Sequence, residues 1–215
     1  MNNATASWDK FLNAQTLRQT LVAASVFLTA YEMLKDALID HLRGFYSHTW
    51  SADGEWEISP EYREKVLSLD KKEMVACAKW FRQGGALDDD DLLLLKEVAD
   101  HRNVVAHELP SILGSIEKDV SLLHLRCIYA LTSKIDKWWI REIEVPTNPD
   151  FDDASPTDEQ LDKSFSIRML TMSLLIQVAE GDDSALVGLY KEWKREIRKT
   201  EHPPVEDRLE PAPEA

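Results

Sequence analysis

Cysteine and glycine are both scarce in this sequence. The 215 residues include only two cysteines, Cys77 and Cys127, which are too few for a disulfide framework and do not form a Cys-x-x-Cys pair. Both occur within helical patterns, so we expect reduced thiols in the core. With 7 glycines and few strand-forming runs, against abundant Ala, Leu, Glu and Lys, the composition predicts an all-α fold.

The motifs of several common enzyme classes are also missing. There is no Gly-x-Gly-x-x-Gly, no Gly-x4-Gly-Lys-Ser/Thr and no Gly-x-Ser-x-Gly, which leaves dinucleotide enzymes, P-loop enzymes and α/β-hydrolases without a starting point. Neither His-Glu-x-x-His nor a Cys/His ligand spacing occurs, so we expect no metal site and no cofactor.

No long hydrophobic run is present. The longest apolar segment, residues 21–31, is interrupted by Ser25 and Thr29 and is too short to cross a bilayer. The N-terminus has no basic start followed by an apolar stretch, so no signal peptide is predicted. We therefore expect a cytoplasmic protein without a membrane partner.

Basic residues are outnumbered by acidic ones. The 25 Lys and Arg against 39 Asp and Glu give a net charge of −14. Such a chain repels generic nucleic acid and acidic membranes, so any phosphate site has to be a local basic patch. The acidic run 88–91 suits the solvated first turn of a helix. The densest basic cluster is typical of a solvated helix face and comprises Lys191, Lys194, Arg195, Arg198 and Lys199.

Apolar residues at spacings of three and four predict a multi-helix bundle. The expected helices cover 8–43, two segments between 60 and 82, then 89–109, 116–144, 157–180 and 183–199. Asp53-Gly54, between short segments that contain Trp50 and Trp56, predicts a small β-hairpin insertion near residues 48–58. A loop packed by its tryptophans would give the same pattern.

We expect a single helical domain over residues 1–199. Its core is predicted to span about 8–144, and a polar, proline-containing connection leads to a C-terminal helical extension over about 157–199. The segment 200–215 is acidic and rich in proline, and is predicted to be disordered.

The predicted helix over 89–109 carries a charge in an unexpected place. At about 100° per residue, Arg102 lies at the centre of its apolar face, among side chains such as Val98 and Val105. Arginine stays charged, so burial requires partners, and a salt bridge to an acidic residue of a neighbouring helix would supply one. Asn103 and His107 lie on the polar strip beside this face.

Arg102, Asn103 and His107 together form the pattern Arg-Asn-x3-His. This pattern resembles the motif of the HEPN family (higher eukaryotes and prokaryotes nucleotide-binding domains), in which these residues lie near the end of a helix in an all-helical bundle. The resemblance covers the motif and the general helical plan, and does not clearly extend to residues 157–215. It implies a metal-independent endoribonuclease with Arg102, Asn103 and His107 as catalytic residues and no cofactor.

The implied chemistry suits these residue types. A ribose 2′-hydroxyl attacks the adjacent phosphorus, while histidine moves the proton and arginine holds the phosphate oxygens. Arg102 and His107 are about 140° apart around the helix and about 7.5 Å apart along it, so one helix does not present both to one phosphorus. Two copies related by a two-fold axis could combine them, as in the shared dimer clefts for which the family is known.

Three functions are compatible with the sequence. The first is an HEPN-type endoribonuclease that cleaves RNA as a homodimer, as a toxin or phage-defence effector with an antitoxin or regulatory protein as partner. The second is a catalytically inactive HEPN-like module that binds nucleotide, RNA or a protein, and the third is a helical interaction protein with a fortuitous motif. Leu109 stands where some HEPN toxins carry a modifiable tyrosine, which argues against that mode of control.

Overall fold

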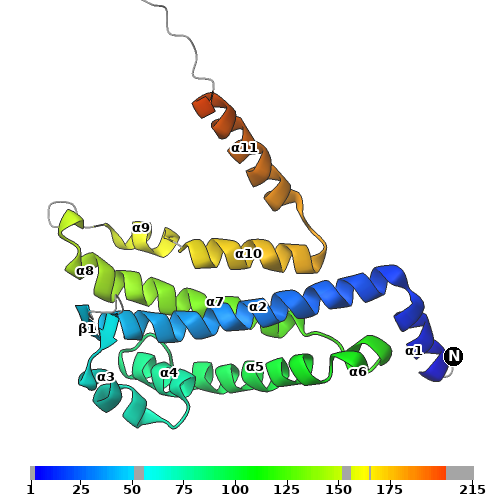
Figure 1. Cartoon of the computed structure of the whole chain (residues 1–215), viewed down its shortest axis with the longest axis horizontal. Coiled ribbons are helices and arrows are strands. Elements are labelled where there is room, and N and C mark those ends of the chain that lie inside the picture. Colours follow the sequence, from blue (N-terminus) through cyan, green and yellow to red (C-terminus); the bar gives the residue numbers. More distant parts are fainter. Residues whose placement is uncertain (1–2, 51–55, 152–155, 165, 202–215) are drawn as a thin grey trace, which may run out of the picture. The chain divides into compact units, whose positions relative to one another are not determined.

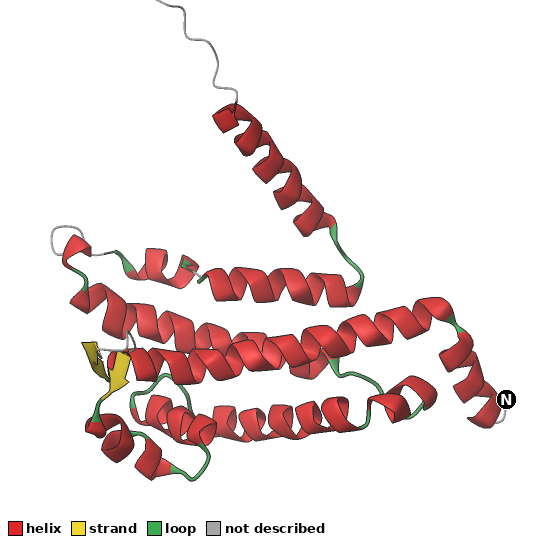
Figure 2. Ribbon diagram, viewed as in Figure 1, coloured by secondary structure: helices red, strands yellow, loops and turns green. Residues whose placement is uncertain are grey.

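A computed structural model describes residues 3–50, 56–151, 156–164 and 166–201. Helices dominate these residues (Figure 2), which confirms the predicted all-α bundle. Contacts divide the chain into two compact units, Met1–Gly181 and Asp182–Ala215. None of the helices in the described part of the chain has the length and apolar character that a bilayer crossing needs.

The first unit begins with two helices where the sequence predicted one. α1 covers Asn3–Leu12 and α2 covers Ala14–Phe45. Asn13 separates them because its backbone is extended and its side-chain oxygen accepts from two backbone N–H groups at the start of α2. The predicted helix over 8–43 is therefore wrong at its N-terminal end, where an N-cap interrupts it.

The predicted β-hairpin is confirmed. β1 (Ser47–Trp50) and β2 (Trp56–Ile58) pair in antiparallel fashion, with Trp50 opposite Trp56. The Asp53-Gly54 turn lies outside the described residues. The chain then forms three short elements, which are α3 (Pro60–Lys65), the 3-10 turn η1 (Leu67–Leu69) and α4 (Glu73–Gln83).

The motif lies on α5 (Asp89–His107). Asp88 caps this helix, and the side chain of Asp91 returns a hydrogen bond to the Asp88 backbone. Asp91 is also buried, and its two carboxylate oxygens accept from Lys134 Nζ at 2.7 and 2.8 Å. The acidic run therefore starts the helix as predicted, but Asp91 is buried beneath Lys134 and is not a solvated residue.

α5 ends at His107, two residues earlier than predicted. The next helix, α6 (Leu109–Gly114), begins almost at once, with Pro110 in its first turn. Proline is tolerated there because first-turn N–H groups have no partner within the helix. The motif histidine thus lies at a corner between two helices.

The rest of the first unit contains two long helices and several short elements. In chain order these are α7 (Leu122–Trp139), the π-helical turn η2 (Ile140–Glu144), α8 (Val145–Thr147), the 3-10 turn η3 (Pro149–Phe151), α9 (Asp158–Lys163) and α10 (Ile167–Glu180). The capping box of Thr157 and Gln160 is present at the start of α9. Ser166 caps α10 and so interrupts the single helix predicted over 157–180.

α2 is the central helix of this unit and packs against α4, α5, α7 and α10 (Figure 1). The α5 residues Leu95, Val98 and Val105 are buried in the same core. The apolar face of the motif helix therefore packs into the interior of a single chain.

The second unit contains α11 (Ser184–Glu201). Gly181, with φ at +86°, ends α10 in the left-handed conformation that glycine adopts without strain. No described side chain of α11 is buried, and Tyr190 and Trp193 are more than half exposed. The contacts assign α11 to a unit of its own, and the single domain over 1–199 stays a prediction. The tail predicted to be disordered lies, from residue 202 on, outside the described residues.

Candidate active site on helix α5

Arg102 faces α2. One of its terminal nitrogens donates to Glu32 Oε1 at 3.1 Å, and its guanidinium carbon lies 5.5 Å from the centre of the Tyr31 ring. The side chain is 33% exposed, while its Nε is buried without a hydrogen-bond partner. The salt bridge that the sequence allowed is therefore present, but it uses only part of the guanidinium.

Glu32 is shared between two cations at the edge of the core. Lys35 Nζ donates to its other carboxylate oxygen at 2.8 Å, and the Glu32 side chain is 44% exposed. The hydrogen bond from Lys35, and after it that from Arg102, holds the pKa of Glu32 below its usual range. Because water reaches the pair, the attraction is weak, and an anionic ligand could take the place of the carboxylate on Arg102.

Asn103 and His107 are both exposed, on the outer surface of the bundle. No described residue makes a hydrogen bond or an ion pair with either side chain, so both are available to a ligand or to a second chain. Arg102 instead contacts α2, and no hydrogen bond among the described residues joins it to His107. The structure therefore presents the three predicted catalytic residues on one helix without assembling them into a single site.

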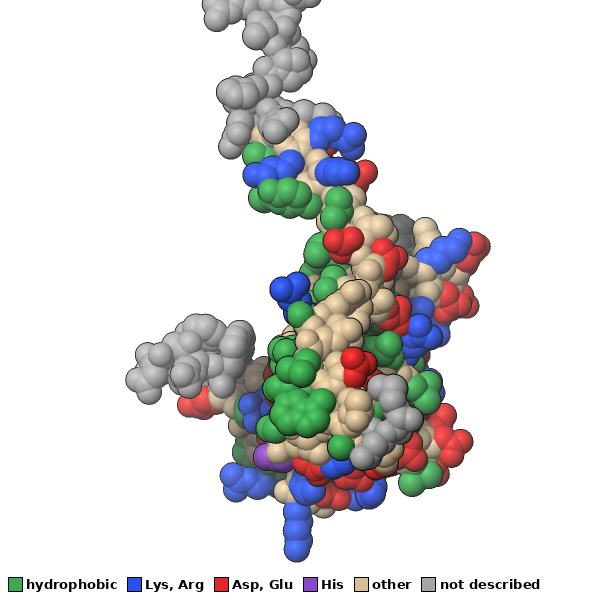
Figure 3. Space-filling view, turned by 90° about the vertical axis from the view of Figure 1, so that its right-hand side faces the viewer, with side chains coloured by type: hydrophobic (Ala, Val, Ile, Leu, Met, Phe, Trp, Pro, Cys, Tyr) green, Lys and Arg blue, Asp and Glu red, His purple; other side chains and the backbone are tan. Residues whose placement is uncertain are grey.

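Exposed apolar side chains lie where α1 meets α6, the helix that follows His107. α1 packs against α6, and Lys10 Nζ fixes this contact by donating to the backbone oxygens of Ser115 and Lys118, both at 2.9 Å. Trp8 is 62% exposed, and Figure 3, which looks onto this end of the unit, shows hydrophobic side chains gathered beside charged ones. Exposed aromatic groups of this kind suit a second protein chain or an unstacked base.

A second polar cluster lies where α2, α7 and α10 meet, and sequence analysis missed it. Asp136 is 2% exposed and accepts from His41 Nε2 at 3.0 Å, from Arg168 at 2.9 Å and from Ser166 Oγ. The His41 ring stacks on Trp139, with centroids 4.5 Å apart. The only sequence signal was a carboxylate next to Ile135 in a buried stripe.

The negative charge of Asp136 is compensated within its own cluster. Burial alone raises the pKa of Asp136, but the hydrogen bonds from His41 and Ser166 and the charge of Arg168 outweigh it and hold the pKa below its usual range. Because the donors meet a common acceptor, we assign the cluster to holding three helices together.

Two further histidines are packed beside the motif. His101 Nε2 accepts the backbone N–H of Ser121 at 3.0 Å, its ring meets Phe27 edge-on, and its centroid lies 4.9 Å from that of His124. Burial, and then the proximity of His124, lowers the pKa of His101. His101 therefore supports the fold.

The remaining candidate groups add no chemistry to the site. Cys77 and Cys127 are free thiols, as predicted, and burial raises the pKa of Cys77 to about 11. Across the described ranges, no group of three or more His, Cys, Asp or Glu is arranged to hold a metal ion.

Comparison of the chain with protein-family models, with curated proteins and with solved structures finds no match. The HEPN resemblance therefore depends on Arg102, Asn103, His107 and the helical plan alone.

Proposed function

We propose that the protein is an HEPN-type, metal-independent endoribonuclease that acts as a homodimer, with RNA as its substrate. One observation carries the proposal: the Arg-Asn-x3-His motif ends a 19-residue helix of an all-α bundle, with Asn103 and His107 exposed and not hydrogen-bonded to any described residue. A toxin or phage-defence role, restrained by an antitoxin or regulatory protein, is the setting in which we expect such an activity.

The proposed reaction is an internal transesterification. The imidazole of His107 takes the proton of a ribose 2′-hydroxyl, the 2′-oxygen bonds to the adjacent phosphorus, and the bond from phosphorus to the 5′-oxygen breaks. The imidazolium returns the proton to that leaving oxygen. The products are a 2′,3′-cyclic phosphate and a free 5′-hydroxyl, and no oxidant or second substrate is needed.

Arg102 and Asn103 stabilise the transition state in this scheme. A guanidinium can hold two phosphate oxygens at once as negative charge builds on them, and an amide can donate to a third. Because Arg102 faces α2 while His107 is exposed, the proposal takes Arg102 from one copy and His107 from the other.

The Arg102–Glu32 pair is compatible with this role. An exposed ion pair contributes about 0 to 1 kcal/mol, whereas a bidentate contact with phosphate is stronger and more directional. Substrate phosphate can therefore displace Glu32 at small cost.

The same pair also favours a second candidate, the catalytically inactive HEPN-like module. With Glu32 bound to Arg102 and a net charge of −14, the protein could bind an anionic ligand weakly and leave it intact. A nucleotide, an RNA or a partner protein would then bind near Arg102 without cleavage.

Incubation of the purified protein with total RNA and with tRNA, in EDTA, tests the proposal. We expect cleavage with cyclic-phosphate ends, reduced by about 10²- to 10⁴-fold in His107→Ala and Arg102→Ala. Arg18→Ala, an exposed arginine on α2, is the matched control and should cleave like the wild type. Circular dichroism and thermal unfolding of each variant establish that it is folded.

Several results would reject the endoribonuclease. Cleavage that disappears on chelation, or that persists in both variants, rejects the mechanism, and a strict monomer by light scattering rejects the shared site. Intact RNA together with saturable binding that Arg102→Ala abolishes would establish the inactive module instead.

A further inference from the structure

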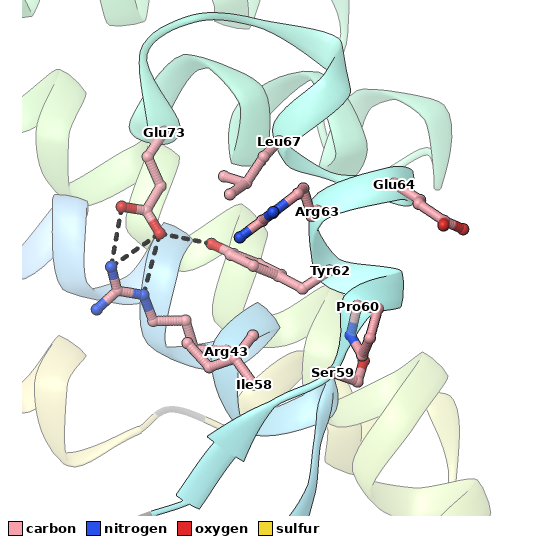
Figure 4. A pocket seen from close by; sticks show the side chains of 9 residues that line it. All are labelled: Arg43, Ile58, Ser59, Pro60, Tyr62, Arg63, Glu64, Leu67 and Glu73. Carbon is pink, nitrogen blue, oxygen red and sulfur yellow. Dashed lines mark hydrogen bonds and ion pairs between the residues drawn. The ribbon is translucent and has the colours of Figure 1, made fainter.

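A cavity of about 590 Å³ opens between α2, α3 and α4, and its lining residues are drawn in Figure 4. None of Arg102, Asn103 and His107 lines it, so an inference about this cavity does not rest on the proposed function. Two arginines and two glutamates line it, so its charges are balanced, unlike those of the whole chain.

One side of the cavity is electrically neutral. Arg43 makes a two-pronged ion pair with Glu73, with Nε 3.0 Å and one terminal nitrogen 2.9 Å from the two carboxylate oxygens. Tyr62 donates its hydroxyl proton to Glu73 Oε1 at 2.8 Å. These bonds, dashed in Figure 4, satisfy Glu73 and keep its charge paired with that of Arg43.

Arg63 supplies a positive charge that nothing in the described structure neutralises. Its guanidinium extends into the cavity over Tyr62, whereas Glu64, the next residue, points away (Figure 4). No described side chain or backbone oxygen accepts from it. In a chain of net charge −14, Arg63 is thus a cation of the lining that no described carboxylate pairs with, unlike Arg43.

Ser59 adds a neutral donor. Its Oγ is buried and has no hydrogen-bond partner, although Ser59 stands at the N-cap position of α3, where serine normally bonds to the helix. A buried hydroxyl without a partner is rare in folded proteins, and each case calls for an explanation such as a ligand. Since Ser59 lines this cavity, a ligand oxygen is the partner that we consider.

The rest of the wall is apolar. Ile58, Pro60 and Leu67 line the cavity together with the charged groups, and Ile58 is 43% exposed. The volume falls in the range of small-ligand pockets, about 300 to 1,000 Å³. The cavity thus combines an oxyanion-binding group, an unused hydroxyl and a hydrophobic surface.

We propose that this cavity binds a phosphate monoester that carries an apolar ring. Arg63 makes charge-assisted hydrogen bonds to two phosphate oxygens, Ser59 donates to the third, and Ile58, Pro60 and Leu67 contact the ring. The two oxygens of a carboxylate would have to accept from Arg63 and Ser59 together, whereas the three terminal oxygens of a phosphate monoester offer a separate acceptor to each donor.

Isothermal titration calorimetry of the full chain with phenyl phosphate tests the site. We expect saturable binding of one molecule per chain, weakened at least 10-fold by Arg63→Ala, partly restored by Arg63→Lys and weakened several-fold by Ser59→Ala. Arg63 is exposed, so its variants should fold, which circular dichroism checks. Arg18→Ala, with the same loss of charge outside the cavity, should bind like the wild type.

Two matched ligands complete the experiment. Benzoate keeps the ring but replaces phosphate by carboxylate, and inorganic phosphate keeps the oxyanion but removes the ring, so both should bind at least 10-fold more weakly than phenyl phosphate. Equal binding of benzoate or of inorganic phosphate would overturn the assignment to a ring-bearing monoester. Absence of binding, or binding that Arg63→Ala leaves unchanged, would overturn the site itself.

Discussion

Two arginine–carboxylate pairs involve or contact α2, and they differ in the solvent exposure of their side chains. Arg102 and Glu32 are 33% and 44% exposed, whereas Arg168 and Asp136 are 23% and 2% exposed. Asp136 receives several donors at once, while Arg102 keeps one buried nitrogen without a partner. The exposed, incompletely bonded pair can exchange a partner for a ligand, and the buried, fully bonded cluster cannot do so without loosening the fold.

Disrupting the buried cluster should have the largest effect. Asp136→Asn removes the charge that His41 and Arg168 share, so we expect a loss of about 3 kcal/mol in the free energy of unfolding. Urea denaturation measures it. Asp100→Asn is the control. The Asp100 side chain is 64% exposed and pairs with Lys96, so its loss should lower the free energy of unfolding by less than about 0.5 kcal/mol. Equal costs for the two variants would remove the distinction between buried and exposed pairs.

The exposed pair should behave in the opposite way. Glu32→Gln lowers the unfolding free energy by only about 1 kcal/mol or less, because solvent screens the interaction. It also releases Arg102, so we expect RNA to bind several-fold more tightly, as measured by fluorescence anisotropy. Glu180→Gln, which removes the partner of Arg126 elsewhere on the surface, makes the same charge change and should leave RNA binding near the wild-type value.

Weaker RNA binding in Glu32→Gln than in Glu180→Gln would mean that Glu32 positions Arg102 productively and does not compete with the phosphate. That result would place Glu32 within the functional site. The Arg102–Glu32 pair would then be a fixed pair, like that of Arg168 and Asp136, and not an exchangeable one.

The sequence predicted what depends on neighbours along the chain. The motif helix, the hairpin and the capping box of Thr157 with Gln160 follow from local spacing, and all are present. The interruptions at Asn13 and Ser166 were missed because polar residues also occur inside helices, and only the backbone shows that these two act as caps.

Long-range pairing was beyond sequence reasoning. The helical wheel placed Arg102 on the apolar face, but it could not choose Glu32 from the 39 acidic residues. His41 and Asp136 are 95 residues apart in the sequence. Arg63 and Ser59 become candidates for ligand binding only because both line the same cavity, which the sequence does not show. The amphipathic pattern of 183–199 predicted a helix correctly, yet it carried no information about what that helix contacts.

The smallest expected effect is on the pH dependence of stability, and it distinguishes His101 from His107 on the same helix. Burial, and then the proximity of His124, holds the pKa of His101 below its usual value of 6.5, so between the folded and unfolded values the native state binds fewer protons. The contribution of His101 to stability is therefore complete above pH 6.5 and is lost as the pH falls through the lower, folded value.

His101→Gln removes this titration while leaving an oxygen that can accept the Ser121 N–H. Urea denaturation between about pH 5.5 and 7.5 should then show a flatter dependence of unfolding free energy on pH than in the wild type. His107→Gln should keep the wild-type slope, because its side chain is exposed and makes no described contact. If His101→Gln kept the wild-type slope while His107→Gln flattened it, the motif histidine would be the one coupled to folding. Its availability to RNA, on which the proposed chemistry depends, would then be lost.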